Sequence, residues 1–174
     1  MNEYLQIFNS LSRCDLSEQR VSLARQFAWA VPNQEAIEYL VSLSPIIEIG
    51  AGTGYWAFLV RQAGGVIRAF DEQPYDNGYC SNKWTEVEVG NPSTVADYPD
   101  HCLFLCWPPG YSPMAYQCLL NYSGDRVVYI GDTDGATGCT RFRKLLQHDW
   151  RLERRIEIPR FPGMFDSLVL YHRK

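Results

Sequence analysis

The sequence predicts an α/β protein in which a mostly parallel, seven-stranded sheet lies between two layers of helices. From Ser44 onward, short β-rich runs alternate with helix-compatible stretches, as they do where helical crossovers join parallel strands. One run, Cys102–Trp107, is apolar throughout, which is typical of a central strand buried on both faces. The last two runs, Leu152–Ile158 and Ser167–His172, are joined by the short segment PRFPGMF. This arrangement predicts an antiparallel hairpin that ends the sheet.

The first 43 residues predict three helices that form an N-terminal cap. Apolar residues recur there at helical spacing in three stretches, which are Tyr4–Leu11, Val21–Phe27 with Ser17 and Glu18 at its start, and Ala36–Val41 after the Pro32-Asn33 break. No linker, repeat or low-complexity tract interrupts the chain, so we expect residues 1–174 to form one domain.

The other elements follow from the same alternation. Strands ahead of the hairpin are expected at Ile46–Ile49, Val66–Asp71, Trp84–Val89, Cys102–Trp107 and Arg126–Ile130. Helices are expected at Tyr55–Gln62, from the cap Ser112 and the first helical residue Pro113 to about Tyr122, and at Thr140–Trp150. Ligands of such sheets bind beyond the carboxyl ends of the strands. The candidate ligand-binding stretches are therefore 50–55, 71–79, 90–94, 107–112, 131–139 and 159–165.

Composition narrows the class of function. The chain has no run of about 18 apolar residues, so we expect no transmembrane helix. It also lacks a basic start followed by an apolar signal core, so we expect a soluble, cytoplasmic protein. Its six cysteines include no CxxC pair, which favours free thiols over a metal site.

Charge is distributed unevenly along the chain. The formal net charge is −4, yet residues 126–174 carry ten Lys and Arg against six Asp and Glu. This basic part is either a solvated face or a site for an anionic substrate. A strong nucleic-acid binder usually has a more basic domain, so nucleic acid is not the expected partner.

The stretch PIIEIGAGTGYWAFLV, residues 45–60, is the most informative part of the sequence. Glu48 is followed by Gly50, Gly52 and Gly54, and glycines permit backbone angles and close ligand approach that a Cβ forbids. The helix after them directs free N–H groups toward a ligand. The dinucleotide pattern GxGxxG fails when counted from Gly50. Counted from Gly52, the pattern places Ala57 at its last position, where alanine can replace glycine, but it leaves two extra residues between the strand and the first glycine. The GK[ST] end of a phosphate loop is absent.

The spacing ExGxGxG resembles motif I of the class I S-adenosylmethionine-dependent methyltransferases, which have a Rossmann-like three-layer fold. The resemblance covers residues 44–174, including the terminal hairpin. It implies S-adenosylmethionine as cofactor, with Glu48 near its ammonium group and Asp71 on its ribose hydroxyls. Asp71 is otherwise an ordinary acid before a turn. The stretch VGN, 89–91, lies where the family contacts adenine. The implied cofactor-binding residues include Glu48, Gly50, Ala51, Gly52, Gly54, Asp71, Gly90 and Asn91.

The stretch WPPGY, residues 107–111, is similar to the [DNS]PP[YFW] motif of methyltransferases that act on amino groups. The prolines match, but Trp107 occupies the polar position, Gly110 stands where the aromatic residue is due, and Tyr111 is one place late. These departures argue against methylation of an exocyclic amine. Trp107 then either stacks on the cofactor or substrate or packs in the core. Trp29, in FAWAVPN, is either a lid over the cofactor or another core residue.

The resemblance predicts a methyltransferase that acts on a small molecule or a protein side chain. Its catalytic residue is not identified by the motif, and the candidates are Asp132, Trp107 and Tyr111. Asp132 lies in YIGDTDGATG after a predicted strand, where it is either a substrate-binding group or general base, or a helix cap. Two alternatives remain at this stage, a non-catalytic Rossmann-like cofactor-binding or scaffold protein and an NAD-dependent oxidoreductase.

Overall fold

The computed structural model describes residues 2–75, 77–132 and 135–174, and its described strands form a seven-stranded sheet. The strand order is β3-β2-β1-β4-β5-β7-β6. Strands β1 to β5 are parallel where they pair, whereas β7 is antiparallel to both β5 and β6. The strands are β1 (Ile46–Ile49), β2 (Ile67–Asp71), β3 (Glu88–Val89), β4 (Cys102–Cys106), β5 (Arg126–Asp132), β6 (Trp150–Glu157) and β7 (Asp166–Arg173). The predicted fold class is confirmed.

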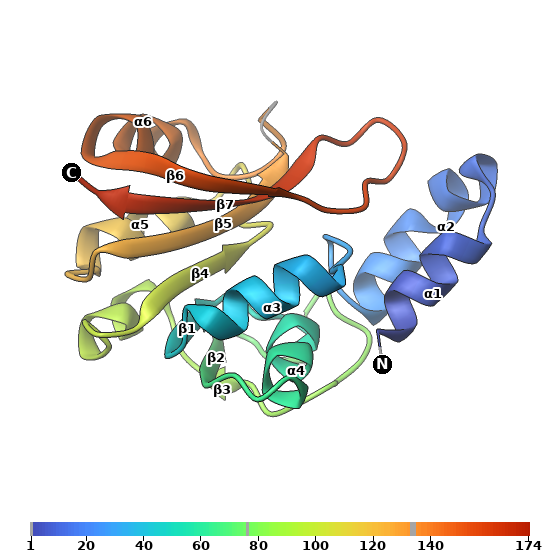
Figure 1. Ribbon diagram of the computed structural model, residues 1–174, viewed down its shortest axis with the longest axis horizontal. Coiled ribbons are helices and arrows are strands. Elements are labelled where there is room, and N and C mark those ends of the chain that lie inside the picture. The colour runs from blue at the N-terminus through green and yellow to red at the C-terminus, as the bar shows by residue number, and fades with distance from the viewer. Residues whose placement is uncertain (1, 76, 133–134) are drawn as a thin grey trace.

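Helices cover both faces of this sheet, and two of them extend past its end (Figure 1). They are α1 (Glu3–Ser10), α2 (Arg13–Gln26), α3 (Gln34–Ser42), α4 (Tyr55–Gln62), α5 (Met114–Asn121), α6 (Thr140–Asp149) and the 3₁₀ helix η1 (Pro92–Asp97). The N-terminal helices and α4 pack in one apolar cluster with one face of the sheet. Helices α5 and α6 pack in a second cluster with the other face. Helices α1 and α2 lie beyond the carboxyl ends of the parallel strands.

Two helices begin at different residues from those predicted. Helix α2 begins at Arg13, ahead of Ser17, because Ser12 and Asp15 form a capping box. The backbone N–H of Asp15 donates to Ser12 Oγ over 3.2 Å. Helix α5 begins at Met114, with Pro113 as its N-cap, and the Met114 N–H donates to Ser112 Oγ over 3.2 Å. The serine therefore stabilises the turn that precedes the helix.

Three strands are shorter than predicted, and of these β2 begins one residue late, at Ile67. Strand β3 is limited to Glu88–Val89 because Trp84 bonds elsewhere. The backbone N–H of Trp84 donates to the Thr53 carbonyl over 2.9 Å, and its indole N–H donates to the Gln26 carbonyl over 2.7 Å. Strand β4 ends one residue before Trp107, whose φ of +53° takes the chain out of the extended conformation.

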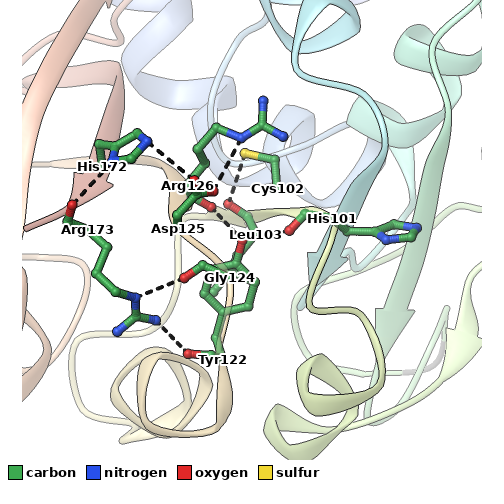
Figure 2. Close-up of polar contacts among 9 residues, drawn as sticks. All are labelled: His101, Cys102, Leu103, Tyr122, Gly124, Asp125, Arg126, His172 and Arg173. Carbon is green, nitrogen blue, oxygen red and sulfur yellow. Dashed lines mark hydrogen bonds and ion pairs between the residues drawn. The ribbon is translucent and has the colours of Figure 1, made fainter.

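The turn that leads into β5 is held by Arg173, the last residue of β7, and Tyr122 of that turn bonds to the amino end of β4 (Figure 2). The Arg173 guanidinium donates to the carbonyls of Gly124 over 2.9 Å and Tyr122 over 2.6 Å. Its central carbon lies 4.3 Å from the centre of the Trp150 ring. The buried Tyr122 hydroxyl lies 2.6 Å from the His101 carbonyl. Polar contacts therefore join β4, β5 and β7 at the end of the sheet opposite the carboxyl ends of the parallel strands.

Candidate functional site

A cavity of about 480 Å³ opens beyond the carboxyl ends of the parallel strands. It lies between the loops that follow β1, β2 and β4 and the segment that joins α2 to α3. This is the edge at which the topology predicts a ligand. Eight of the residues expected to bind a cofactor line the cavity, namely Trp29, Glu48, Gly50, Ala51, Gly52, Asp71, Gly90 and Trp107.

The glycine loop uses the backbone freedom that its glycines permit. The φ angles are +80° at Gly50, +54° at Gly52 and +75° at Gly54, a region that residues with a Cβ rarely adopt. A Cβ at Gly50 would lie 2.9 Å from the Met114 side chain, and one at Gly52 would lie 3.0 Å from Cys80 Sγ. Both positions line the cavity, so the bare backbone of this loop forms part of its wall.

Two of the predicted residues, Gly54 and Asn91, lie outside the cavity lining. Gly54 is the N-cap of α4, and a Cβ there would lie 2.8 Å from the Val87 side chain, so this glycine permits close packing. The Asn91 side-chain oxygen accepts a hydrogen bond of 2.8 Å from the Ser93 N–H at the start of η1. Neighbouring Gly90 and Pro92 line the cavity instead.

Asp71 reaches back from the end of β2 to the glycine loop. Its Oδ2 accepts a hydrogen bond of 3.0 Å from the Gly52 N–H, and its Oδ1 accepts one of 2.9 Å from the Gln73 N–H. The carboxyl group is partly exposed in the cavity lining. Since each carboxylate oxygen offers two acceptor positions, Asp71 retains capacity for a ligand while it orders the loop.

Glu48 is the buried acid at the floor of the cavity. Its side chain is 2% exposed, and no donor among the described residues reaches Oε2. Burial raises the pKa of this carboxyl to about 8, with a smaller lowering effect from Arg61. The indole N–H of Trp56, a second lining residue, is likewise buried without an acceptor in the described chain. An acceptor and a donor are thus left unsatisfied at one cavity, a costly arrangement without a ligand.

Trp107 belongs to the cavity and to a polar contact behind it. It lines the cavity and stacks on Trp29, with ring centres 5.7 Å apart and planes inclined by 23°. Its indole N–H donates a hydrogen bond of 2.9 Å to Asp166 Oδ1. The guanidinium of Arg20 lies 5.1 Å from the Trp107 ring centre. Left-handed backbone at a bulky residue is strained and concentrates at functional sites.

Sequence reasoning missed Asp166, which is 1% exposed at the start of β7. Burial raises its pKa to about 6, the Trp107 hydrogen bond lowers it, and Asp132 raises it. Asp132 and Asp166 are paired residues of β5 and β7. An acid directly before the apolar run SLVL was the one available signal.

The candidate catalytic residues differ in their access to the cavity. Tyr111 lines it and is 78% exposed, whereas Asp132 is buried and does not line it. The second acid of that loop, Asp134, lies outside the described residues. Cys106 also lines the cavity, and burial raises the pKa of its thiol well above the usual value, so the thiol stays protonated at neutral pH.

The proline motif does not present the groups expected for an amine. The Pro108 carbonyl accepts a hydrogen bond of 2.8 Å from the Gly138 N–H. The Trp107 side chain, in the motif's polar position, is bonded to Asp166. A Cβ at Gly110 would lie 2.8 Å from the Ala136 carbonyl, which explains why this position has no aromatic side chain.

In residues 2–75, 77–132 and 135–174, no group of three or more His, Cys, Asp and Glu side chains is arranged to hold a metal ion. Over the same residues, no helix combines the length and apolarity that a membrane span requires.

Comparison with known proteins gives matches by structure. No protein-family description and no curated protein matches the sequence. Magnesium protoporphyrin IX methyltransferase from Synechocystis PCC 6803, solved with bound S-adenosylmethionine, is similar with a TM-score of 0.56 at 12% identity, covering 80% of this chain and 77% of that one. Precorrin-6y C5,15-methyltransferase from Geobacter metallireducens GS-15 has a TM-score of 0.52 at 16% identity, covering 86% and 93%.

A third match spans a smaller part of a longer protein. The tRNA (uracil-54, C5)-methyltransferase from Pyrococcus abyssi, solved with S-adenosylhomocysteine, has a TM-score of 0.53 at 16% identity, covering 79% of this chain and 37% of that one. Identities this low establish architecture only. The chain has the fold of the class I S-adenosylmethionine-dependent methyltransferases.

Proposed function

We propose that the protein is an S-adenosylmethionine-dependent methyltransferase that acts on a small molecule or a protein side chain. One observation carries the proposal: the buried Glu48 carboxyl, with Oε2 unpartnered among the described residues, lies at the foot of a left-handed glycine loop. A cationic group is the partner that a buried carboxylate needs. The α-ammonium of the cofactor would supply it.

The unsatisfied atoms at the cavity suit the amino-acid end of this cofactor. Glu48 Oε2 lacks a donor and Trp56 Nε1 lacks an acceptor in the described chain, while an amino acid brings an ammonium donor and a carboxylate acceptor. The glycine loop would lie against the methionine chain and ribose. Asp71 would accept from the ribose hydroxyls while it keeps its bond to Gly52.

The charge of the cavity favours this cofactor over a nicotinamide dinucleotide. Among the described lining residues, the acids are Glu48, Asp71 and Glu72, and no Lys or Arg lines the cavity. The dinucleotide carries a diphosphate, which would face these carboxylates without a lining cation. S-adenosylmethionine carries a sulfonium and an ammonium, so its net charge is complementary to that of the cavity.

The chain would contribute to catalysis mainly by placement. The bound cofactor would supply a methyl group on a sulfonium, and transfer requires the acceptor atom in line with the S–C bond. Much of the rate enhancement in such a reaction comes from alignment of the two reactants. Trp29, Trp107 and Tyr111, which line the cavity, would hold the acceptor and exclude water from it.

Transfer of label from methyl-tritiated S-adenosylmethionine tests the proposal. The purified protein is incubated with small-molecule and protein fractions of a cell extract, alongside Gly52→Val as the matched inactive variant. We expect label in one fraction with the wild-type protein and none with the variant. Cofactor binding without labelling of either fraction would favour the scaffold alternative.

A further inference from the structure

The cavity has two halves of different chemistry. All three acidic lining side chains of the described residues, Glu48, Asp71 and Glu72, lie on β1, on β2 or directly after β2. The opposite half is built by the segment between α2 and α3, the end of β4, and the loops after β4 and β5. Its described lining residues carry no charge, and they include Trp29, Cys106, Trp107, Pro109, Tyr111 and Ala136. We call this the uncharged half.

Aromatic side chains dominate the uncharged half and its rim. Trp29 stacks on Trp107, and Tyr79 meets Trp29 edge-on with ring centres 6.4 Å apart and planes at 69°. Of the exposed aromatic side chains in the described chain, Tyr79 (46%) and Tyr111 (78%) line the cavity, and Phe165 does not. Exposed aromatic surface gathered at one cavity is typical of a binding site.

We propose that the uncharged half binds the methyl acceptor, and that this acceptor is a flat heteroaromatic molecule without negative charge. The inference rests on the proposed function and names its substrate class. A flat ring matches the stacked indoles and the exposed Tyr111 ring, because aromatic faces stack on one another. An anionic acceptor would face the acids Asp71 and Glu72, with Glu48 as a third acid below them. No Lys or Arg of the described residues lines the cavity, and Arg20, 5.1 Å from the Trp107 ring centre, is outside the lining.

The acceptor atom is a ring nitrogen. The buried acids Asp132 and Asp166 do not line the cavity, and burial holds the pKa of the lining Cys106 thiol well above its usual value. The described lining of the uncharged half therefore offers no ionised base, and the acceptor must present a free lone pair at neutral pH. This lone pair forms the new N–C bond while the S–C bond breaks and its electron pair stays on sulfur. The nitrogen becomes cationic and the sulfonium becomes a neutral thioether.

Calorimetric titration with three matched probes tests this assignment. Isoquinoline is flat and neutral at pH 7, isoquinoline-1-carboxylate is flat and anionic, and decahydroisoquinoline has the same ring skeleton but is not flat and is cationic. Each is titrated into the protein with and without saturating S-adenosylhomocysteine. We expect isoquinoline to bind at least ten times more tightly than either other probe.

The outcomes separate the two proposals. Equal or tighter binding of the carboxylate or of the saturated probe, or no binding of isoquinoline in either state, would overturn the acceptor assignment whatever the cofactor does. Failure of S-adenosylhomocysteine to bind would overturn the proposed function, and the titrations without it would still test the aromatic site.

Variants assign the binding to the uncharged half. Tyr111→Ala should weaken isoquinoline binding at least fivefold without a change in melting temperature, because this ring is exposed. Phe165→Ala, at an exposed aromatic residue outside the lining, is the matched control and should bind as the wild-type protein does. Equal effects of the two substitutions would contradict the proposal.

Discussion

The indole N–H of Trp107 donates a hydrogen bond of 2.9 Å to the carboxyl oxygen Oδ1 of Asp166. The two residues are 59 positions apart in the chain, and the bond joins the cavity wall after β4 to the start of β7. Because Asp166 is 1% exposed, this donor favours the ionised carboxylate that burial disfavours. The contact thus links the shape of the cavity to the charge state of a buried acid.

Replacing Trp107, the hydrogen-bond donor to Asp166, should destabilise the protein in a pH-dependent way. Asp166 has a pKa raised from 3.8 to about 6, so its stabilising contribution is full below 3.8 and is lost as the pH rises through 6. Trp107→Phe should raise this pKa further. We expect a loss of about 1–3 kcal/mol in the free energy of unfolding at pH 8, and a smaller loss at pH 4. Urea unfolding at the two pH values measures both.

Trp29→Phe is the control for that experiment, since it changes the neighbouring indole but leaves the Trp107–Asp166 bond in place. Its effect on stability should be the same at both pH values. If Trp107→Phe also loses equal stability at pH 4 and pH 8, the hydrogen bond does not govern the ionisation of Asp166.

Glu48→Gln should make the ligand-free protein less sensitive to alkaline pH. The pKa of Glu48 is raised from 4.5 to about 8, so its contribution to stability is full below 4.5 and is lost as the pH rises through 8. The variant has no group to ionise there. Its melting temperature should therefore fall less than that of the wild-type protein between pH 5 and pH 9. Parallel melting curves would refute the assignment of a buried, protonated Glu48.

The same residue should make cofactor affinity depend on pH. An ammonium group favours ionised Glu48, so S-adenosylmethionine should bind the wild-type protein more tightly at pH 8 than at pH 6. Loss of a charged hydrogen bond costs about 1.5–3 kcal/mol, which corresponds to roughly a tenfold to hundredfold weaker affinity for Glu48→Gln at pH 8. The variant should show little change with pH. A wild-type affinity that does not vary with pH would remove Glu48 from the ammonium site.

Gly52→Val should abolish cofactor binding in a folded protein. The new side chain would be strained at φ +54° and would project beside Cys80 at the cavity wall. Gly64→Val is the matched control, because Gly64 also has a left-handed φ, +88°, but open space around it and no place in the lining. Both variants should lose stability, whereas Gly64→Val alone should bind S-adenosylmethionine normally by calorimetry. Normal binding by folded Gly52→Val would contradict the loop assignment.

Arg173→Lys should weaken the contacts at the amino ends of β4 and β5 and leave the cavity unchanged. Lysine keeps the charge but loses the planar group that bonds two carbonyls and lies over Trp150. We expect a loss of about 1–2 kcal/mol in the free energy of unfolding, with unaltered cofactor affinity. Arg151→Lys, at an exposed position of β6, should change neither quantity. A change in the cofactor affinity of Arg173→Lys would show that the amino ends of the strands are coupled to the cavity at their carboxyl ends.

Local sequence patterns were sufficient for the parallel sheet and for its glycine loop. Gly50, Gly52 and Gly54 were expected to permit backbone angles that a Cβ forbids, and all three have positive φ. Asp71 is the last residue of its strand as expected, since strand ends in alternating α/β sequences are marked by the change of apolar pattern. The terminal hairpin likewise follows from two β-rich runs that are adjacent in sequence.

The features that were missed depend on contacts distant in sequence. Strand β3 is short because Trp84 bonds to Thr53 and to Gln26, which no local pattern indicates. Asp166 is buried because β7 pairs with β5 and because the loop after β4 brings an indole to it. The choice posed for Trp107, site or core, was too narrow, since the residue lines the cavity and also bonds to a buried acid.

A calorimetric titration of the purified wild-type protein with S-adenosylmethionine, S-adenosylhomocysteine and NAD is the most direct test of the central claim. We expect one equivalent of S-adenosylmethionine to bind with a micromolar dissociation constant, the demethylated product to bind comparably, and NAD to bind at least tenfold more weakly. Tighter binding of NAD than of S-adenosylmethionine, or no binding of either S-adenosyl compound, would contradict it.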